Sequence, residues 1–261
     1  MSVLFYLISF LIALCGILAI IIYMESCNNN LSINEGFESS PKDIPITFIV
    51  MTSIKERVDN VNNIIKNNDL TNTTIYDAII GNEQNRELLY KNNTINEFTK
   101  NKIRDGAIGC TLSHINIWKE FVKSNIGSDK LVVLEDDMDV VDDFKNKLKN
   151  YVNHLPSDFD ISQIYLSDTN ERNNSNVRKI NDFVETGYPQ NGTVGYIISK
   201  TGAKKLLKHS LPMYEAIDVM IKDAIRENKI ISYVPTEKLV LHKFKFESSV
   251  CEKGKACNSK M

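Results

Sequence analysis

The chain has 261 residues, and its 31 Lys and Arg residues nearly balance its 33 Asp and Glu residues, which leaves a formal net charge of −2. Proteins that bind the phosphate backbone of nucleic acids concentrate basic residues on one surface. The near-neutral composition therefore argues against that class, and we expect no nucleic-acid partner. A chain of this length forms one large domain or two small ones.

The first 24 residues predict a transmembrane anchor. Residues 3–24 contain no charged side chain and are long enough, as a helix, to cross the roughly 30 Å of bilayer hydrocarbon. No basic residue precedes this stretch and no small-residue cleavage site follows it, which favours an uncleaved anchor over a cleaved signal peptide, the alternative. Residues 25–43 are polar and rich in Asn, Ser and Glu, as in a flexible stem. The folded domain is therefore expected at residues 44–261.

Membrane topology is not readable from the charges, because no Lys or Arg precedes the apolar stretch and the first one after it is Lys42. We expect a single-pass type II membrane protein whose domain lies in a secretory-pathway lumen, with the orientation left open. In such an oxidising compartment, Cys251 and Cys257 are candidates for a disulfide that closes a small loop.

The spacing of apolar residues predicts alternating strands and helices from residue 46 onward. The first half gives a strand at 46–51, a helix at 55–67, a strand at 74–80, a loop with one or two short helices at 81–102 and a helix at 106–124. The second half gives a strand at 131–134, a helix at 142–153, strands at 161–166 and 193–199, helices at 202–209 and 217–228, and strands at 230–234 and 239–242. Ser199 and Thr201 are cap candidates for the helix at 202–209. This alternation predicts an α/β fold with a mostly parallel sheet covered by helices on both faces.

An acidic cluster directly follows one of these strands. Residues 131–134 are apolar and strand-like, and Glu135, Asp136, Asp137 and Asp139 come immediately after them. Crowded carboxylates repel one another unless a positive charge lies among them, and a divalent cation is the simplest candidate. The carboxyl end of a strand is also where open α/β sheets bind ligands. A solvated acidic turn is the alternative.

Three segments in a fixed order carry a resemblance to a known family. These are GAIGCTLSHINIWKEF at 106–121, LVVLEDDMD at 131–139, and TVGYIISKTGAKKLL followed by AIDVMI within 193–221. Together they resemble glycosyltransferase family 25, which contains lipopolysaccharide galactosyl- and glucosyltransferases and the collagen hydroxylysine galactosyltransferases. The likeness covers about residues 46–250.

The resemblance implies a Rossmann-like GT-A fold and an inverting transfer of a hexose, galactose or glucose, from a nucleotide sugar such as a UDP-hexose. It implies Mn²⁺ or Mg²⁺ as cofactor and a hydroxyl of a glycan, lipid-linked glycan or protein as acceptor. The family's acidic triplet falls on Glu135, Asp136 and Asp137, with Asp137 as the expected metal ligand. Asp139 offers a second register for the metal, and His242 is a candidate further ligand or a structural histidine.

Two more regions gain roles from the resemblance. Gly109, Cys110, Ser113 and His114 match the family's G-C-x-x-S-H block, which places Ser113 and His114 in the wall of the donor site. Arg57 corresponds to a family arginine that faces the nucleotide. Without the resemblance, we would interpret Cys110 as a buried free thiol, His114 as a structural histidine and Arg57 as a surface residue.

An inverting transfer needs a base that takes the proton of the acceptor hydroxyl. Asp218, in the AIDVMI block, is the first candidate, and Glu215 is the reserve. The alternative for Asp218 is a cap at the start of a helix.

The chain also departs from the family pattern. Met51 and Thr52 stand where the family has Asn-Leu, Ala107 stands where it often has an acid, and residues 247–250 lack its Asp. A membrane-anchored GT-A domain that binds glycans or partners without catalysis is therefore the alternative function. A metal-dependent nuclease or phosphatase fits less well, because further metal-spaced ligands and a basic surface are missing from the sequence.

Overall fold

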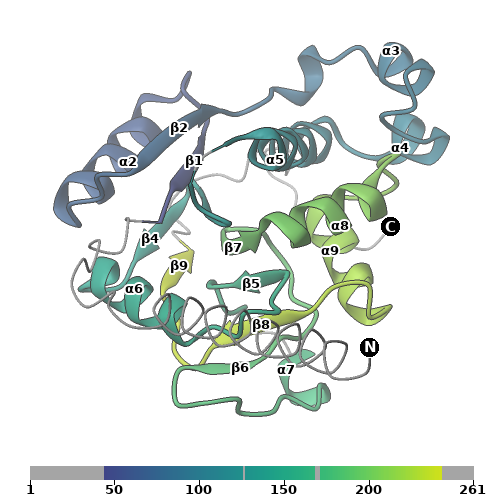
Figure 1. Ribbon diagram of the computed structural model, residues 1–261. Coiled ribbons are helices and arrows are strands. Elements are labelled where there is room, and N and C mark those ends of the chain that lie inside the picture. Colours follow the sequence, from purple (N-terminus) through teal and green to yellow (C-terminus); the bar gives the residue numbers. More distant parts are fainter. Residues whose placement is uncertain (1–43, 126, 168–170, 243–261) are drawn as a thin grey trace, which may run out of the picture. The chain divides into compact units, whose positions relative to one another are not determined.

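The computed structural model describes residues 44–125, 127–167 and 171–242 (Figure 1). The predicted anchor at 1–24, the predicted stem at 25–43 and the Cys251–Cys257 pair lie outside these residues. Within the described ranges, no helix has both the length and the apolar character that a membrane crossing requires.

Seven of the described strands form one sheet in the order β2-β1-β3-β7-β5-β8-β6, and two form a separate β4–β9 ribbon. The strands are β1 (Ile46–Val50), β2 (Thr73–Asp77), β3 (Lys130–Glu135), β4 (Met138–Val140), β5 (Ile161–Gln163), β6 (Val184–Thr186), β7 (Gly195–Ser199), β8 (Ser232–Pro235) and β9 (Val240–His242). Strands β2, β1, β3, β5 and β8 run in one direction, whereas β7 and β6 run opposite to their neighbours. The predicted mostly parallel sheet is confirmed.

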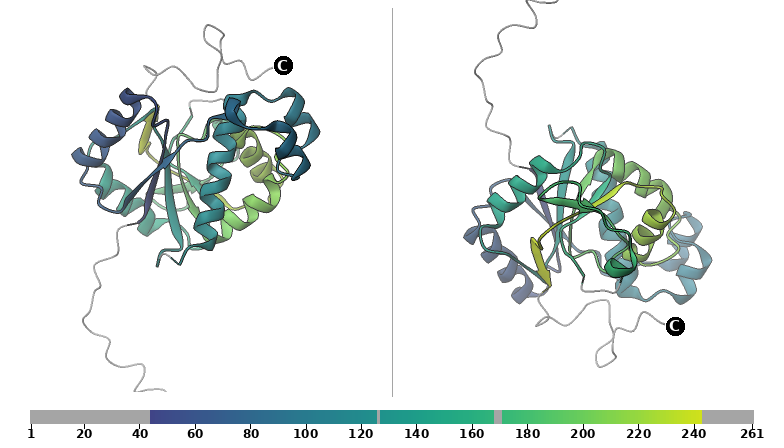
Figure 2. Two further views of the ribbon diagram at one scale, coloured as in Figure 1. Left: turned by 90° about the horizontal axis from the view of Figure 1, so that it is seen from above. Right: turned by 90° about the horizontal axis from the view of Figure 1, so that it is seen from below.

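Helices cover both faces of this sheet (Figure 2). The described helices are α2 (Lys55–Asn67), η1 (Gly81–Glu83, 3₁₀), α3 (Arg86–Lys91), α4 (Glu97–Lys102), α5 (Asp105–Lys123), α6 (Phe144–His154), α7 (Glu171–Asn174), α8 (Lys200–Ser210) and α9 (Ile217–Arg226). Helices α2 and α6 lie on one face, and α5, α8 and α9 lie on the other (Figures 1 and 2).

Strand β3 shows why the sequence forms a two-faced sheet. Its alternate residues Val132 and Leu134 pack into the apolar cluster shared with α2 and α6. Leu131 and Val133 pack into the cluster shared with α5, α8 and α9. A continuous apolar run is typical of a strand buried on both faces. Each such buried side chain contributes roughly 1.5–3 kcal/mol relative to exposure, so the central strand is held from both sides.

The predicted elements are found with small shifts and three omissions. Ser199 caps α8 as predicted, because its Oγ accepts a hydrogen bond from the Gly202 N–H at 2.9 Å, whereas Thr201 lies inside the helix. Strand β5 ends earlier than predicted because the chain then turns toward β9, where Tyr165 bridges to Val240. The short elements β4, β6 and α7 were not predicted.

Two strand pairings bring the acidic residues to one edge of the sheet. Strands β1 and β3 are parallel with Ile49 beside Glu135, so their carboxyl ends lie together. The β4–β9 ribbon pairs Met138 with His242, which places the late histidine beside the turn that follows β3. The acidic run thus lies at the edge where open α/β sheets bind ligands.

Candidate active site

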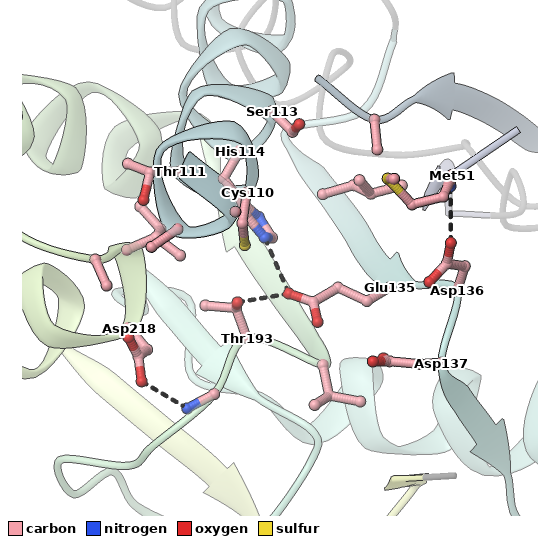
Figure 3. A pocket seen from close by; sticks show the side chains of 18 of the residues that line it. Met51, Cys110, Thr111, Ser113, His114, Glu135, Asp136, Asp137, Thr193 and Asp218 are labelled. Carbon is pink, nitrogen blue, oxygen red and sulfur yellow. Dashed lines mark hydrogen bonds and ion pairs between the residues drawn. The ribbon is translucent and has the colours of Figure 1, made fainter. Parts of the chain in front are cut away.

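A cavity of about 870 Å³ opens at the carboxyl ends of β1 and β3 (Figure 3). Its walls are the loop after β2, the first half of α5, the turn after β3, the loop before β7, the start of α9 and part of β9. Cavities of about 300–1,000 Å³ hold small molecules and cofactors. Eight of the predicted site residues line it: Arg57, Ser113, His114, Glu135, Asp136, Asp137, Asp218 and His242. Asp139 and Glu215 are the two that do not.

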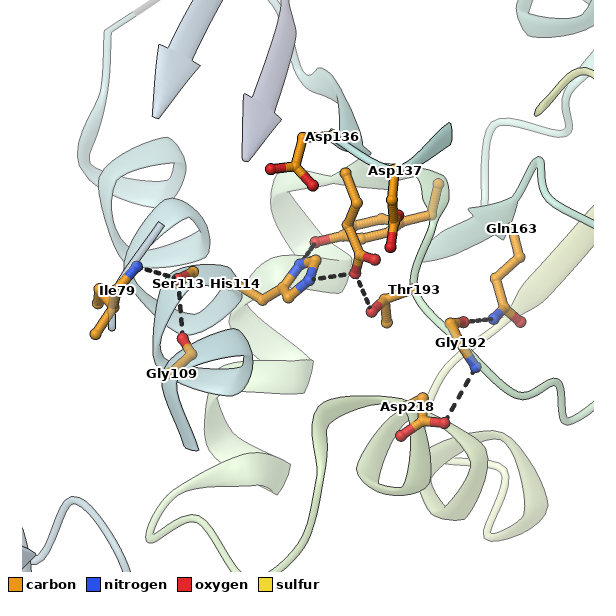
Figure 4. Close-up of polar contacts among 12 residues, drawn as sticks. Ile79, Gly109, Ser113, His114, Asp136, Asp137, Gln163, Gly192, Thr193 and Asp218 are labelled. Carbon is orange, nitrogen blue, oxygen red and sulfur yellow. Dashed lines mark hydrogen bonds and ion pairs between the residues drawn. The ribbon is translucent and has the colours of Figure 1, made fainter. Parts of the chain in front are cut away.

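Glu135 is held in place by two hydrogen-bond donors. Its Oε1 lies 3.1 Å from His114 Nε2 and accepts a hydrogen bond from Thr193 Oγ1 at 2.6 Å (Figures 3 and 4). Burial by itself raises the pKa of Glu135, but the bonds from His114 and Thr193 more than offset it and lower the pKa below its ordinary value. The carboxylate is therefore ionised at neutral pH.

His114 is fully buried in a chain of hydrogen bonds. Its Nδ1 lies 2.8 Å from the Tyr196 hydroxyl, and that hydroxyl accepts a hydrogen bond from Trp118 Nε1 at 2.9 Å. We assign the Nε2–H tautomer to a neutral His114, because Tyr196 can then donate to Nδ1 while Nε2 donates to Glu135. The ring orientation is thus fixed from α5 and β7 together.

Asp136 is occupied by protein groups. Its carboxylate forms a buried ion pair with Arg57 and accepts a hydrogen bond from the Met51 N–H at 2.7 Å. Asn60 Nδ2 donates to the backbone carbonyl of Asp136 at 3.1 Å, which fixes the turn itself to α2. Arg57, predicted to face a nucleotide, lines the cavity while its guanidinium neutralises this carboxylate.

Asp137 has a different environment. Its Oδ1 is buried and has no hydrogen-bond partner among the described residues, and its Oδ2 lies 3.8 Å from His242 Nε2. Burial, followed by the charge of Glu135, raises the pKa of Asp137 from 3.8 to about 7. Burial also lowers the pKa of His242 below its ordinary value. A buried carboxylate oxygen with no protein donor is a position that a bound cation can satisfy.

The two remaining predicted acids lie elsewhere. Asp139 accepts a hydrogen bond from the N–H of Val140 at 3.0 Å and lines a separate hollow with Glu56 and Asp59 of α2. Glu215 accepts a hydrogen bond at 3.0 Å from the N–H of Ala216, which lines the cavity, but Glu215 itself is not among the lining residues. The structure therefore places neither of them in the lining of the cavity that contains Asp137.

Asp218 lies in the first turn of α9 and faces the cavity (Figure 4). Its Oδ2 accepts a hydrogen bond from the Gly192 N–H at 3.1 Å, and its Oδ1 accepts one from the Val219 N–H at 2.9 Å. The N-cap of α9 is Ala216, so Asp218 is not the cap residue. It instead fixes the loop before β7 against the helix, with its carboxylate at the cavity wall.

The pattern G-C-x-x-S-H has a structural explanation in α5. Ser113 Oγ donates to the Gly109 carbonyl and accepts a hydrogen bond from the Ile79 N–H, both at 2.9 Å. A Cβ on Gly109 would lie 2.3 Å from the Ile79 carbonyl oxygen, so only glycine allows the loop after β2 to approach the helix this closely. Ser113 thus lines the cavity while its hydroxyl joins two of the cavity walls.

Two contributors were missed from the sequence. Thr193, which holds Glu135, begins the third family block, but nothing in that block assigned it a role before the fold was known. Tyr196 reads as one more apolar residue of a buried strand, although its hydroxyl orients His114. Cys110, interpreted as a buried thiol, lines the cavity and is partly exposed there.

The comparisons with known proteins concern the family of the chain. The family model described as glycosyltransferase family 25 (LPS biosynthesis protein) matches residues 44–221. Procollagen galactosyltransferase 1 of Danio rerio is 38% identical over 124 residues, which are 44% of this chain and 20% of that protein. Procollagen galactosyltransferase 2 of Homo sapiens is 30% identical over 132 residues, 47% of this chain and 21% of that protein.

Other relatives include proteins described as inactive. Inactive glycosyltransferase 25 family member 3 of Mus musculus is 28% identical over 125 residues, 47% of this chain and 20% of that protein. Among solved structures, apo mouse xyloside xylosyltransferase 1 gives a TM-score of 0.38 at 7% identity, covering 72% of this chain and 83% of that one. The chain thus spans about a fifth of the length of the procollagen galactosyltransferases it matches. The family match, which extends over the acidic turn, the G-C-x-x-S-H helix and Asp218, shows that the chain belongs to glycosyltransferase family 25.

Proposed function

We propose that this chain is a metal-dependent inverting glycosyltransferase with a GT-A fold. It transfers a hexose from a UDP-sugar to a hydroxyl group of a glycan, lipid-linked glycan or protein. Galactose is the first candidate sugar because two relatives are named procollagen galactosyltransferases, and glucose is the second. The observation that carries the proposal is Asp137, whose buried Oδ1 has no donor among the described residues and faces a cavity of nucleotide-sugar size.

The donor set at this position suits Mn²⁺ or Mg²⁺. Asp137 supplies carboxylate oxygens and His242 supplies Nε2 at 3.8 Å from one of them. Hard cations take oxygen ligands and complete their shell with substrate phosphates and water, and Mn²⁺ also accepts imidazole. When bound, the cation neutralises the charge that develops on the departing diphosphate. Asp139 lies outside this cavity, so the register that uses Asp137 is the one we propose.

The neighbouring residues position the donor. Arg57 and the Met51 N–H hold Asp136, and His114 and Thr193 hold Glu135, so the turn that carries Asp137 is rigid before any ligand binds. Charged groups that are already held in position stabilise a transition state more than flexible ones, because no reorganisation is needed during the reaction. The part of the cavity between this turn and α5 is the proposed donor site.

Asp218 is the proposed base. It approaches the cavity from α9, a different wall from the acidic turn, and its carboxylate is oriented by the Gly192 and Val219 N–H groups. In an inverting displacement, the acceptor hydroxyl attacks from the side opposite the leaving diphosphate. A base on the far wall therefore takes the acceptor proton while the donor end holds the leaving group. Glu215 is not among the residues that line the cavity, so Asp218 is the base we propose.

The domain is proposed to work at a membrane, held by the apolar residues 3–24 as a single-pass type II anchor in a secretory-pathway lumen. The support for this placement is the uncharged character of that segment and the polar composition of residues 25–43 that follow.

A non-catalytic glycan-binding domain is the second candidate function. It is favoured by the relative described as inactive and by Met51 and Thr52 at the end of β1. A panel of nucleotide sugars incubated with the chain, with Mn²⁺ or with a chelator, separates the two functions. Catalysis predicts release of the nucleoside diphosphate from one donor only when Mn²⁺ is present. Binding of a donor without any release, on folded protein and with every metal tried, would establish the second function instead.

A further inference from the structure

A second group of side chains of metal-ligating types, Cys110 and His114 of α5 and Glu135 at the end of β3, lies in the cavity apart from Asp137 and His242. Among the described residues, the ligand atoms of Cys110, His114 and Glu135 all lie within 4.8 Å of one another. Cys110 and His114 are one helical turn apart on α5, which puts their side chains on the same face. Figure 3 shows the thiol beside the imidazole ring, with both directed toward the Glu135 carboxylate.

These distances are close to those of a tetrahedral zinc site. Two ligand atoms bound to Zn²⁺ at roughly 2.0–2.3 Å lie about 3.3–3.7 Å apart in a tetrahedron. His114 Nε2 and Glu135 Oε1 are already 3.1 Å apart, and the Cys110 thiol lies within 4.8 Å of both atoms, so a change of its side-chain rotation is the step that completes the site. Three protein ligands leave the fourth position open to the cavity, as in catalytic rather than structural zinc sites.

The donor atoms differ in kind from those at Asp137. Thiolate sulfur and imidazole nitrogen favour Zn²⁺, whereas carboxylate oxygens together with phosphate favour Mn²⁺ or Mg²⁺. For equal geometry, Zn²⁺ also binds more tightly than Mn²⁺. The site formed by Cys110, His114 and Glu135 therefore favours Zn²⁺ over the Mn²⁺ or Mg²⁺ proposed for the transfer reaction.

The surroundings orient these ligands as around known metal sites. Histidines that bind a metal usually hold their second ring nitrogen in a hydrogen bond, and His114 Nδ1 is 2.8 Å from the Tyr196 hydroxyl. Tyr196 is itself fixed by Trp118 Nε1 at 2.9 Å, and Thr193 Oγ1 fixes Glu135 at 2.6 Å. The Trp118 and Thr193 contacts are kept when a metal binds, whereas the His114–Tyr196 bond reverses, so that Nδ1–H donates to the Tyr196 hydroxyl.

We propose that Cys110, His114 and Glu135 form an inhibitory Zn²⁺ site inside the donor cavity. On binding, the Cys110 S–H bond breaks, its proton goes to solvent and a Zn–S bond forms, while the His114 proton moves from Nε2 to Nδ1. The cation replaces the hydrogen bond between His114 and Glu135, and its bulk, together with the ligand at its open fourth position, occupies the proposed donor site beside the acidic turn. Donor binding and Zn²⁺ binding therefore exclude each other, and this inhibition rests on the proposed transferase function.

Metal binding is tested without any activity measurement. Co²⁺, which takes zinc sites and absorbs through thiolate-to-metal charge transfer, is added to a full-length variant that retains only Cys110, with serine at the other four cysteines. The matched control also carries Cys110→Ser. We expect the charge-transfer band in the first protein, its loss on addition of Zn²⁺ but not Mn²⁺, and no band in the control. A band in both proteins or in neither would overturn the proposal.

A second binding measurement uses the wild-type chain, in case the cysteine variants do not fold. Zn²⁺ should protect Cys110 from alkylation by iodoacetamide, as read by mass spectrometry, and equal alkylation with and without Zn²⁺ would contradict the site.

For inhibition, transfer is measured at saturating Mn²⁺ while the Zn²⁺ concentration is increased. Cys110→Ser should raise the half-inhibitory Zn²⁺ concentration by about tenfold or more, since even an outer-shell partner of a metal ligand is worth that much. An unchanged half-inhibitory Zn²⁺ concentration would refute the inhibition. The charge-transfer band tests metal binding alone, and its outcome does not depend on whether the chain is a transferase.

Discussion

The three consecutive carboxylates after β3 have separate roles because their partners differ. Glu135 receives hydrogen bonds from His114 and Thr193, and Asp136 is neutralised by Arg57. Asp137 has a buried oxygen without a donor among the described residues. The free energy of leaving a buried charged group unsatisfied is larger than that of an ordinary hydrogen bond. Asp137 is therefore the residue of this turn whose unsatisfied buried charge a bound cation would compensate.

Stability of the metal-free protein should depend on the protonation of Asp137. Its pKa is 3.8 ordinarily and about 7 in the folded state, so between these pH values the folded state binds more protons than the unfolded state. The free energy of unfolding then falls as pH rises from about 4 to about 7, by at most about 1.4 kcal/mol per pH unit for one proton. Urea unfolding with a chelator should show this fall in the wild type relative to Asp137→Asn. If the free energies of unfolding of the two proteins differ by the same amount at every pH in this range, the burial of Asp137 is contradicted. Addition of Mn²⁺ should raise the free energy of unfolding of the wild type at pH 7.

Replacing Asp218 with Asn separates donor binding from transfer. The base acts only on the acceptor hydroxyl, whereas metal and nucleotide contacts position the donor. Asp218→Asn keeps a side-chain oxygen for the Gly192 N–H, so calorimetry should find UDP and Mn²⁺ binding close to that of the wild type. Transfer should fall by roughly 10²-fold or more, the usual worth of a positioned base. Transfer within a few-fold of the wild type would leave Asp218 with a purely structural role.

At the scale of elements, helix α5 organises the site. Its first half contributes Cys110, Ser113 and His114 to the cavity, and Gly109 lets the loop after β2 pack directly on the helix backbone. The helix lies against the sheet through Ile108, Ile115 and Trp118, which are fully buried. One apolar face thus anchors the helix while the adjoining face carries polar groups into the site.

Gly109→Ala tests this packing, because close packing predicts a loss of stability where an ordinary helix position predicts a gain. In an ordinary helix interior, Ala in place of Gly stabilises by about 1 kcal/mol. Here the new Cβ would lie 2.3 Å from the Ile79 carbonyl oxygen and 2.7 Å from the Gly81 nitrogen, and backbone atoms cannot rotate away. We expect a loss of roughly 1–3 kcal/mol in urea unfolding, as for other overpacked sites.

The matched control for this variant is Glu120→Ala, at an exposed position of the same helix, which should change stability by no more than about 0.5 kcal/mol. A Gly109→Ala protein as stable as the wild type, or more stable, would show that the loop after β2 is not held against α5 as described.

Elements with a strong apolar period were predictable, whereas the short elements β4, β6 and α7 were not. The helices at α2 and α5 and the strand β3 carry enough apolar residues for their spacing to decide the structure. Strands β4 and β6 have few residues, and their pairing depends on β9 and β8, which lie far along the chain. The reversed direction of β7 is equally invisible in the sequence, because a buried strand looks the same in either orientation.

At the scale of the whole molecule, the sequence predicted most of the residues that meet at the cavity but not the separate contacts that each of them makes there. The family blocks identified the acidic turn, Asp218 and the α5 motif, and all of these reach one cavity. The contributions of Thr193 and Tyr196 depend on β7 lying beside β3, which no local pattern encodes. Asp139 was a candidate because of its spacing, yet the pairing of β4 with β9 directs it to another surface.

Removal of residues 1–26 should release a soluble, folded and active domain. Among the described residues, the sheet, the two large apolar clusters and the cavity are formed from Ile44 onward, so we expect the domain to fold without the deleted segment. Size-exclusion chromatography and thermal unfolding of the fragment, beside detergent-solubilised full-length chain as control, check this. Aggregation of the fragment in every solution tried would indicate that the apolar segment packs against the domain.

Cation-dependent turnover at Asp137 is the central claim, and one comparison tests it most directly. Release of nucleoside diphosphate from the best nucleotide-sugar donor is measured for the wild type and Asp137→Asn, each with saturating Mn²⁺ and with a chelator. The wild type should turn over only with Mn²⁺, and the variant should stay near background in both conditions. Its thermal midpoint should be equal or higher, because one of several crowded like charges is gone. A folded Asp137→Asn protein that keeps most of the wild-type turnover at saturating Mn²⁺ would contradict the claim.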